Sequence, residues 1–100
     1  MVQKIEWTSR ARNDLRNIHE YIAADSIRYA QVQIENILVA VSNLLSFPAM
    51  GRLVPEFPHL PYRELIVGNY RILYRYEEQQ ERVLVMTVVH GRRLIIEPPQ

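Results

Sequence analysis

The dipeptide Gly68-Asn69 is the feature that most constrains how this chain folds. Gly and Asn accept the positive φ that a two-residue β-hairpin turn requires, and the flanking runs, 62–67 and 70–76, are rich in Val, Ile, Leu and Tyr. A third run of the same kind, 83–89, follows a polar loop. The sequence therefore predicts a three-stranded antiparallel meander in the C-terminal half. Arginines stand inside these strands, where apolar residues would stabilise a sheet better.

A two-residue turn also fixes which side chains share a face. It places Val67 opposite Tyr70 and Leu65 opposite Ile72 on a mainly apolar face, which we expect to pack on helices. The other face is polar and aromatic and carries Tyr62, Glu64, Arg71 and Arg75. This pattern is typical of an antiparallel sheet with one covered face. The run 83–89 is apolar at nearly every position, which predicts a strand in the middle of the sheet, buried on both sides.

The N-terminal half predicts a short strand over 2–7 and then two helices. Thr8 or Ser9 is the expected N-cap of the first helix, which ends near Ala24, and Asp25 or Ser26 is the expected cap of the second. Apolar residues recur three and four apart along both helices, from Ala11 to Ile22 and from Ala30 to Leu45, with Val39 and Ala40 widening the second band. The short connection between them requires an antiparallel helical hairpin.

Phe47-Pro48 stops the second helix, and an irregular proline-containing stretch follows to Pro61. We expect Phe57 and Leu60 to pin this stretch to the core. The fold class predicted for the single domain 1–100 is α+β. It consists of a strand, a helical hairpin and a three-stranded antiparallel meander, with the helices packed on one face of the sheet. The first strand is expected to complete a four-stranded sheet.

Composition excludes several classes of protein. A chain of 100 residues that is 48% hydrophobic and 23% charged can form one globular core. It has no cysteine, and His19, His59 and His90 lack metal-ligand spacing, so we expect neither a metal nor a cofactor. No apolar run approaches the roughly 20 residues of a membrane span, and no signal peptide is recognisable, which predicts a cytoplasmic protein without a membrane partner. The net charge of +1 disfavours broad nucleic-acid binding.

An ordered set of residues between about 7 and 93 carries a family resemblance. The set comprises Trp7-Thr8, Ala11, Asp14-Leu15, Ile18, Tyr21-Ile22, Pro48, Gly51-Arg52, Pro55-Glu56, Arg63-Glu64, Val67-Gly68, Tyr70-Arg71-Ile72, Tyr74 and Val89-His90-Gly91-Arg92-Arg93. It resembles the ParE-type toxins of the RelE/ParE toxin–antitoxin superfamily. The resemblance implies the fold derived above. It also implies that the chain is the toxin of a bacterial type II system, held in a hetero-oligomer by a cognate antitoxin whose C-terminal segment wraps it.

Two activities occur in that superfamily. The RelE branch cleaves mRNA on the ribosome, and the ParE branch is associated with inhibition of DNA gyrase. By resemblance, Arg71 and Arg93 look like the two arginines with which the nuclease branch stabilises phosphate charge. However, Tyr62 and Glu64 stand where that branch carries lysines, and no Tyr, His or Lys follows Arg93. Since each positioned acid or base contributes about a hundredfold in rate, this departure favours the ParE activity, a toxin that binds and inhibits gyrase.

Two alternatives stay open beside gyrase inhibition. The chain is either a RelE-like ribosome-dependent mRNA endonuclease that uses Arg71, Arg93 and His90, or a non-toxic relic that only binds antitoxin. His90, alone at the end of an apolar strand, is alternatively a hydrogen-bonded structural residue. No residue is assigned a catalytic role if the target is gyrase.

The predicted contacts to the target or antitoxin combine arginine, tyrosine and acidic side chains, and arginine and tyrosine are enriched at interface hot spots. They are Tyr62, Glu64, Arg71, Arg75, Arg92 and Arg93. Within this set, Arg71 either contacts the target or pairs with Glu64 diagonally across the hairpin.

Overall fold

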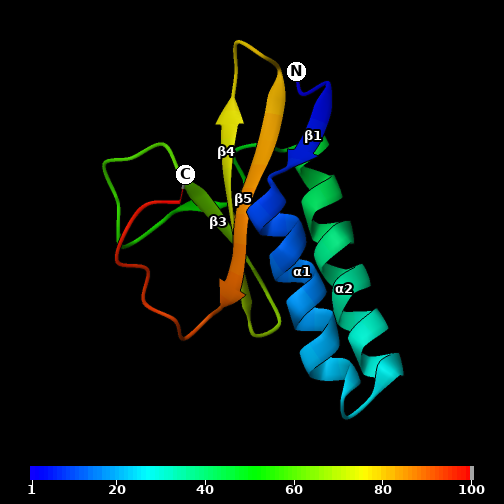
Figure 1. Cartoon of the computed structure of the whole chain (residues 1–100). Helices are drawn as coiled ribbons and strands as arrows, with labels where there is room; N and C mark the ends of the chain where they lie inside the picture. The colour runs from blue at the N-terminus through cyan, green and yellow to red at the C-terminus, as the bar shows by residue number, and fades with distance from the viewer. Residues whose placement is uncertain (100) are drawn as a thin grey trace.

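The computed structural model describes residues 1–99. In chain order its elements are β1 (Lys4–Trp7), α1 (Ser9–Ala23), α2 (Ile27–Ser42), the 3₁₀ turn η1 (Asn43–Leu45), β2 (Arg52–Leu53), β3 (Arg63–Val67), β4 (Tyr70–Glu77) and β5 (Arg82–His90). The strands form one sheet in the order β1-β5-β4-β3-β2, in which only β1 runs parallel to its neighbour. The helical hairpin packs on one face of this sheet, which confirms the predicted α+β fold (Figure 1).

The helices begin where the sequence places their caps. The Thr8 hydroxyl accepts a hydrogen bond from the amide of Ala11, and the Ser26 hydroxyl accepts one from the amide of Tyr29. The apolar stripes of both helices face the sheet and each other. The sequence predicts that the apolar stripe of the second helix continues to Leu45. In the structure the 3₁₀ turn η1 follows α2, and its tighter winding leaves Leu45 44% exposed. Within the described residues, neither helix is long and apolar enough to cross a membrane.

The β3–β4 hairpin has the predicted register. Val67 pairs with Tyr70 and Leu65 with Ile72, and Gly68 takes the positive φ of +57° that the turn requires. The position of β5 differs from the prediction. It is an interior strand, as its apolar sequence indicates, but β4 occupies the middle of the sheet. The reason is that β1 adds beyond β5, while the unpredicted two-residue strand β2 adds beyond β3.

The start of α1 completes the outer edge of β5. Strand β1 stops at the pair Trp7–Val85, which leaves the rest of that edge without a neighbouring strand. The Thr8 hydroxyl donates to the carbonyl of Met86 at 2.8 Å. Further along α1, Asp14 Oδ2 accepts hydrogen bonds from the Thr87 hydroxyl at 2.5 Å and from the Val88 amide at 2.9 Å. These bonds fix α1 against β5.

The sheet carries an apolar cluster on each face. The larger cluster lies between the sheet and the helices and includes Ile37, Ile72 and Tyr74. The smaller one forms on the opposite face from Val54, Phe57, Leu73 and Val89, with Leu60, Tyr62 and Ile95 packed against it. Phe57 and Leu60 therefore pin the proline-containing stretch, as predicted. The expectation of a single covered face is corrected, because this stretch and the C-terminal tail after β5 cover part of the second face (Figure 1).

Candidate partner-binding face

Arg71 lies at the centre of the second face. It projects from β4, away from the helices, and is only 5% exposed. Its Nε and Nη2 donate hydrogen bonds to Glu64 Oε1 at 2.9 and 2.6 Å. Its Nη1 and Nη2 also donate one each to the two carboxylate oxygens of Glu56, at 2.7 and 2.6 Å. Nη1 also donates to the carbonyl of Arg93 at 3.0 Å. These five hydrogen bonds use all five N–H groups of the guanidinium.

The two carboxylates around Arg71 have further partners of their own. Glu64, 1% exposed, accepts a third charged hydrogen bond, from Arg52 Nε at 2.7 Å. Glu56 accepts one from the main-chain amide of Ile95 at 3.1 Å. The hydrogen bonds from Arg71 outweigh burial and lower the pKa of Glu56 to about 2, and the same carboxylates raise the pKa of Arg71. Two positive and two negative side chains thus form a balanced, ordered cluster, the Arg71 cluster.

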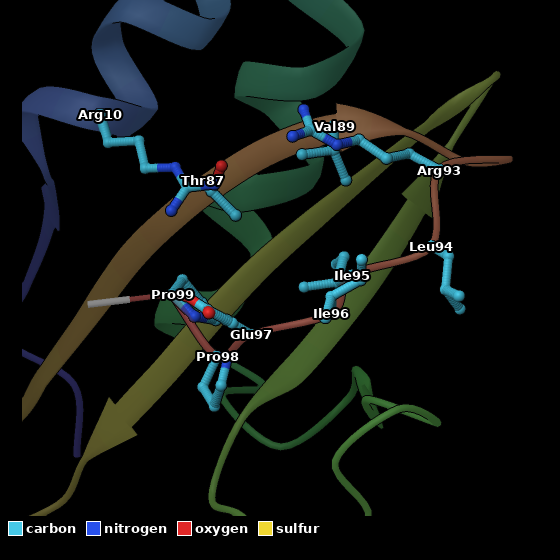
Figure 2. Close-up of a pocket in the computed structure, with 10 residues that line it drawn as sticks. All are labelled: Arg10, Thr87, Val89, Arg93, Leu94, Ile95, Ile96, Glu97, Pro98 and Pro99. Atoms are coloured by element: carbon cyan, nitrogen blue, oxygen red, sulfur yellow. The ribbon is translucent and has the colours of Figure 1, made fainter.

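The C-terminal tail, residues 91–99, lies over this cluster. Besides the contacts of Arg93 and Ile95, its Pro99 carbonyl accepts a hydrogen bond from the Tyr62 hydroxyl at 3.2 Å. Between the tail, β5 and α1 lies a cavity of about 630 Å³. In Figure 2, Arg10 reaches from α1 toward Thr87, and the side chain of Arg93 turns back over β5 beside Val89.

The remaining predicted contacts are spread around the rim of this face. Arg75 pairs with Glu77 at 2.5 Å and keeps 34% of its side chain exposed. Tyr62 is half-buried, whereas Arg92 and Arg93 are exposed. The structure thus places Glu64 and Arg71 beneath the surface and leaves Arg75, Arg92, Arg93 and part of Tyr62 open to a partner.

His90 lies on the other side of the sheet. It pairs with Tyr70 in the β4–β5 ladder, and paired residues share a face, so its ring is on the helix side while Arg71 is not. The rings of His90 and Tyr70 meet edge to face with centroids 5.7 Å apart, and His90 Nδ1 accepts a hydrogen bond from the Arg92 amide at 3.2 Å. The fold therefore does not bring Arg71, Arg93 and His90 together around one phosphate.

Sequence reasoning missed three members of this face: Glu56, Arg52 and Arg10. The signal available for Glu56 was its setting between Pro55 and Phe57, because a proline and a buried aromatic residue together indicate an ordered loop. Arg52 lies in β2 and Arg10 in the first turn of α1. Tertiary packing brings both residues to this face, and no local sequence pattern sets them apart from the other arginines. Among residues 1–99, no group of three or more His, Asp or Glu side chains is arranged to hold a metal ion.

Comparison with known proteins identifies the family of this chain. Residues 5–95 match the model of the family described as ParE toxin of type II toxin–antitoxin system. The chain belongs to the ParE toxin family. No curated protein is a significant sequence relative of it.

Solved structures of this superfamily share the fold of this ParE-family chain. A chain of the chromosomal ParDE toxin–antitoxin system from Pseudomonas aeruginosa superimposes with a TM-score of 0.72 at 17% identity, over 87% of this chain and 94% of that one. A chain of the RelBE2 toxin–antitoxin complex from Mycobacterium tuberculosis gives 0.60 at 22% identity, over 90% and 99%. The isolated Escherichia coli RelE toxin gives 0.62 at 16% identity, over 90% and 85%. At these identities the likeness concerns the fold.

Proposed function

We propose that this ParE-family chain is a toxin that inhibits DNA gyrase by binding it and that a cognate antitoxin neutralises it. The observation that carries the proposal is the saturation of Arg71. All five of its N–H groups already have acceptors, and four of the five bonds go to carboxylates. A phosphate that approached this guanidinium would find no free donor and would face two negative charges.

The position of His90 supports the same choice between the two superfamily activities. Cleavage of RNA needs a base, an acid and charge stabilisation around one phosphate. In this chain the imidazole lies on the helix side of the sheet, and Arg93 faces the cavity on the opposite side. Protein binding needs no such convergence, because its energy comes from buried area around a few anchor side chains.

The proposed contacts to gyrase are the exposed members of the partner-binding face: Tyr62, Arg75, Arg92 and Arg93. Glu64 and Arg71 contribute from below, since the Arg71 cluster holds the loop and the tail that shape the surface. Arginine and tyrosine side chains on an ordered support are typical binding hot spots.

The proposal of an antitoxin partner rests on the family and on the named relatives. The similar chains from Pseudomonas aeruginosa and Mycobacterium tuberculosis come from toxin–antitoxin systems. Strand β2 is a short edge strand with both residues exposed, and an extended antitoxin segment would add to it by main-chain hydrogen bonds. Carboxylates on that segment would suit the exposed arginines nearby.

A supercoiling assay with purified gyrase tests the target. We expect the protein to block supercoiling at a few-fold molar excess and the double substitution Arg92→Glu with Arg93→Glu to lose most of that inhibition. The double substitution Arg16→Glu with Arg28→Glu, which makes two charge reversals at exposed positions of α1 and α2, is the matched control and should inhibit like the wild type. Unimpaired supercoiling with wild-type protein would contradict the proposal.

Two further measurements separate the alternatives. Primer extension after in vitro translation would reveal cuts in codon register if the chain were a ribosome-dependent nuclease, and we expect none. Expression in bacteria should arrest growth, and co-expression with the protein encoded by the adjacent open reading frame should restore it. Harmless expression would instead indicate a relic that only binds antitoxin.

A further inference from the structure

A second cavity, of about 340 Å³, lies on the helix side of the sheet. It forms where the connection between α1 and α2 approaches the β3–β4 turn, on the opposite face of the sheet from the Arg71 cluster. Its walls include the rings of Tyr21, Tyr29, Tyr70 and His90. Tyr21 and Tyr29 are 79% and 57% exposed, so their rings have little cover from the protein itself. We call this site the tyrosine pocket.

The side-chain amide nitrogen of Gln33, a residue that lines the tyrosine pocket, is buried without a partner. Gln33, on α2, is only 7% exposed, and its Nε2 is buried with no hydrogen bond to any of residues 1–99. The β3–β4 turn sits directly on this amide, because a Cβ on Gly68 would lie 3.2 Å from both Nε2 and Oε1. A buried donor without an acceptor destabilises a fold, and an apolar group of similar shape in the same place would destabilise it less. The fold supplies no acceptor for this nitrogen, and a ligand oxygen reaches it only when the amide of Gln33 rotates toward the pocket that the residue lines.

The walls of the pocket select the charge of such a ligand. Asp25 also lines it and forms no ion pair within the described residues. Aromatic faces carry negative potential and attract cations, and a free carboxylate beside three tyrosines strengthens this preference. A planar guanidinium stacks on rings and donates a forked pair of hydrogen bonds to a carboxylate better than a strongly hydrated ammonium does.

We propose that the tyrosine pocket binds an arginine side chain presented by a protein partner. The guanidinium lies against the faces of Tyr21 and Tyr29 and pairs with Asp25. The Gln33 amide rotates toward the pocket, and its Nε2 donates a hydrogen bond to the peptide carbonyl of the same segment. A space of this size suits one long side chain with its peptide group, since whole ligand pockets are commonly about 300–1,000 Å³. The site is independent of the gyrase proposal because it occupies the other face of the sheet.

Isosteric probes test the charge requirement. Amide resonances of Asn69 and Tyr70 would be followed by NMR while N-acetyl-arginine methylamide is added at millimolar concentration. We expect saturable shifts, with the citrulline analogue, which has the same shape but no charge, binding at least about fivefold more weakly. Free arginine, which carries a negatively charged carboxylate in place of the peptide carbonyl and would be repelled by Asp25, should also bind more weakly. Equal binding of the citrulline analogue, tighter binding of free arginine, or no saturable shift would overturn the proposal.

Substitutions test whether the arginine probe binds in the tyrosine pocket. Asp25→Asn and Tyr21→Ala should each weaken binding of the arginine probe about fivefold, whereas Glu35→Gln, which removes an exposed carboxylate from α2 outside the pocket, should not. Gln33→Leu should weaken binding and leave the Tm of the free protein unchanged or higher, because it removes an unpaired buried donor. Equal weakening by Glu35→Gln and Asp25→Asn would mean general electrostatic attraction and would contradict a specific site.

Discussion

At the scale of single residues, the Arg71 cluster shows why a buried arginine is retained in a sheet. Arg71 and Glu64 lie within hydrogen-bonding distance inside one hairpin, and Glu56 reaches them from a loop. Such clusters stabilise a fold less than their short distances suggest, since desolvation opposes attraction. Their larger effect is on what happens when one member is lost, because the remaining charges stay buried without compensation.

Removal of Glu64 should therefore lower the free energy of unfolding far more than removal of one partner of an ordinary surface ion pair. We expect Glu64→Ala to lower the free energy of unfolding by about 3 kcal/mol, because Arg71 keeps its charge beneath the surface. Adding Arg71→Met to that variant should cost less than Arg71→Met costs in the wild type, because one of the two carboxylate partners of Arg71 is already absent. Urea unfolding of the two single variants and the double variant measures this coupling. Additive losses would contradict a shared cluster.

Glu56 makes stability depend on pH. Its pKa is about 2 in the folded protein against an ordinary value of 4.5, so its contribution is complete above about pH 5 and disappears as pH falls toward 2. We expect Glu56→Gln to be less stable than the wild type by about 3 kcal/mol at neutral pH, with the gap closing across that window. Urea unfolding at a series of pH values measures the gap. Glu20→Gln, which removes an exposed carboxylate, controls for the change in net charge.

At the scale of elements, the contact between α1 and β5 explains how a short N-terminal strand is enough to complete that side of the sheet. Strand β1 pairs with four residues of β5, and the first turns of α1 supply side-chain partners for the three that follow. Helix and strand are thereby fixed to each other through hydrogen bonds as well as through the apolar stripe of α1.

Asp14 is the critical partner in that contact. We expect Asp14→Ala to destabilise the fold by about 2 kcal/mol, because the buried amide of Val88 loses its acceptor. Thr87→Val removes a hydroxyl but leaves that amide bonded, so its effect should be smaller. Thermal unfolding of both variants gives the order of their effects. A larger loss from Thr87→Val would show that the hydroxyl, and not the amide, carries the contact.

At the scale of the whole molecule, the sheet separates two layers of different strength. The helical layer forms the main core, whereas the opposite layer consists of the stretch after η1 and the tail, held by the smaller apolar cluster and the Arg71 cluster. The proposed gyrase contacts lie in the weaker layer, and the tyrosine pocket lies at the edge of the stronger one.

Deletion of residues 94–100 should loosen only the weaker layer. Without Ile95 and the Pro99 carbonyl, we expect faster amide exchange in residues 54–62 and unchanged protection in α1 and α2. Hydrogen–deuterium exchange with mass spectrometry resolves the two layers. Leu94→Ser removes an apolar side chain that is 71% exposed and should leave both layers unchanged. Faster exchange in the helices would mean that the layers unfold together.

The sequence by itself determined the helices, the β3–β4 hairpin and its register, and the α+β class. These depend on local periodicity, on capping residues and on the turn at Gly68-Asn69, all of which act over a few residues. It also indicated the pairing of Arg71 with Glu64, since hairpin register places them close together.

Only the tertiary structure decided the rest of the site. Glu56, Arg52 and the tail reach Arg71 from segments that no local rule connects to β4, and the packing of the second face brings them together. The β4–β5 ladder likewise sets His90 and Arg71 on opposite faces, because side chains alternate along a strand. Long-range packing thus gave every N–H group of Arg71 an acceptor. It left Gln33 Nε2, like Arg75 Nε, buried without a hydrogen-bond partner among the described residues.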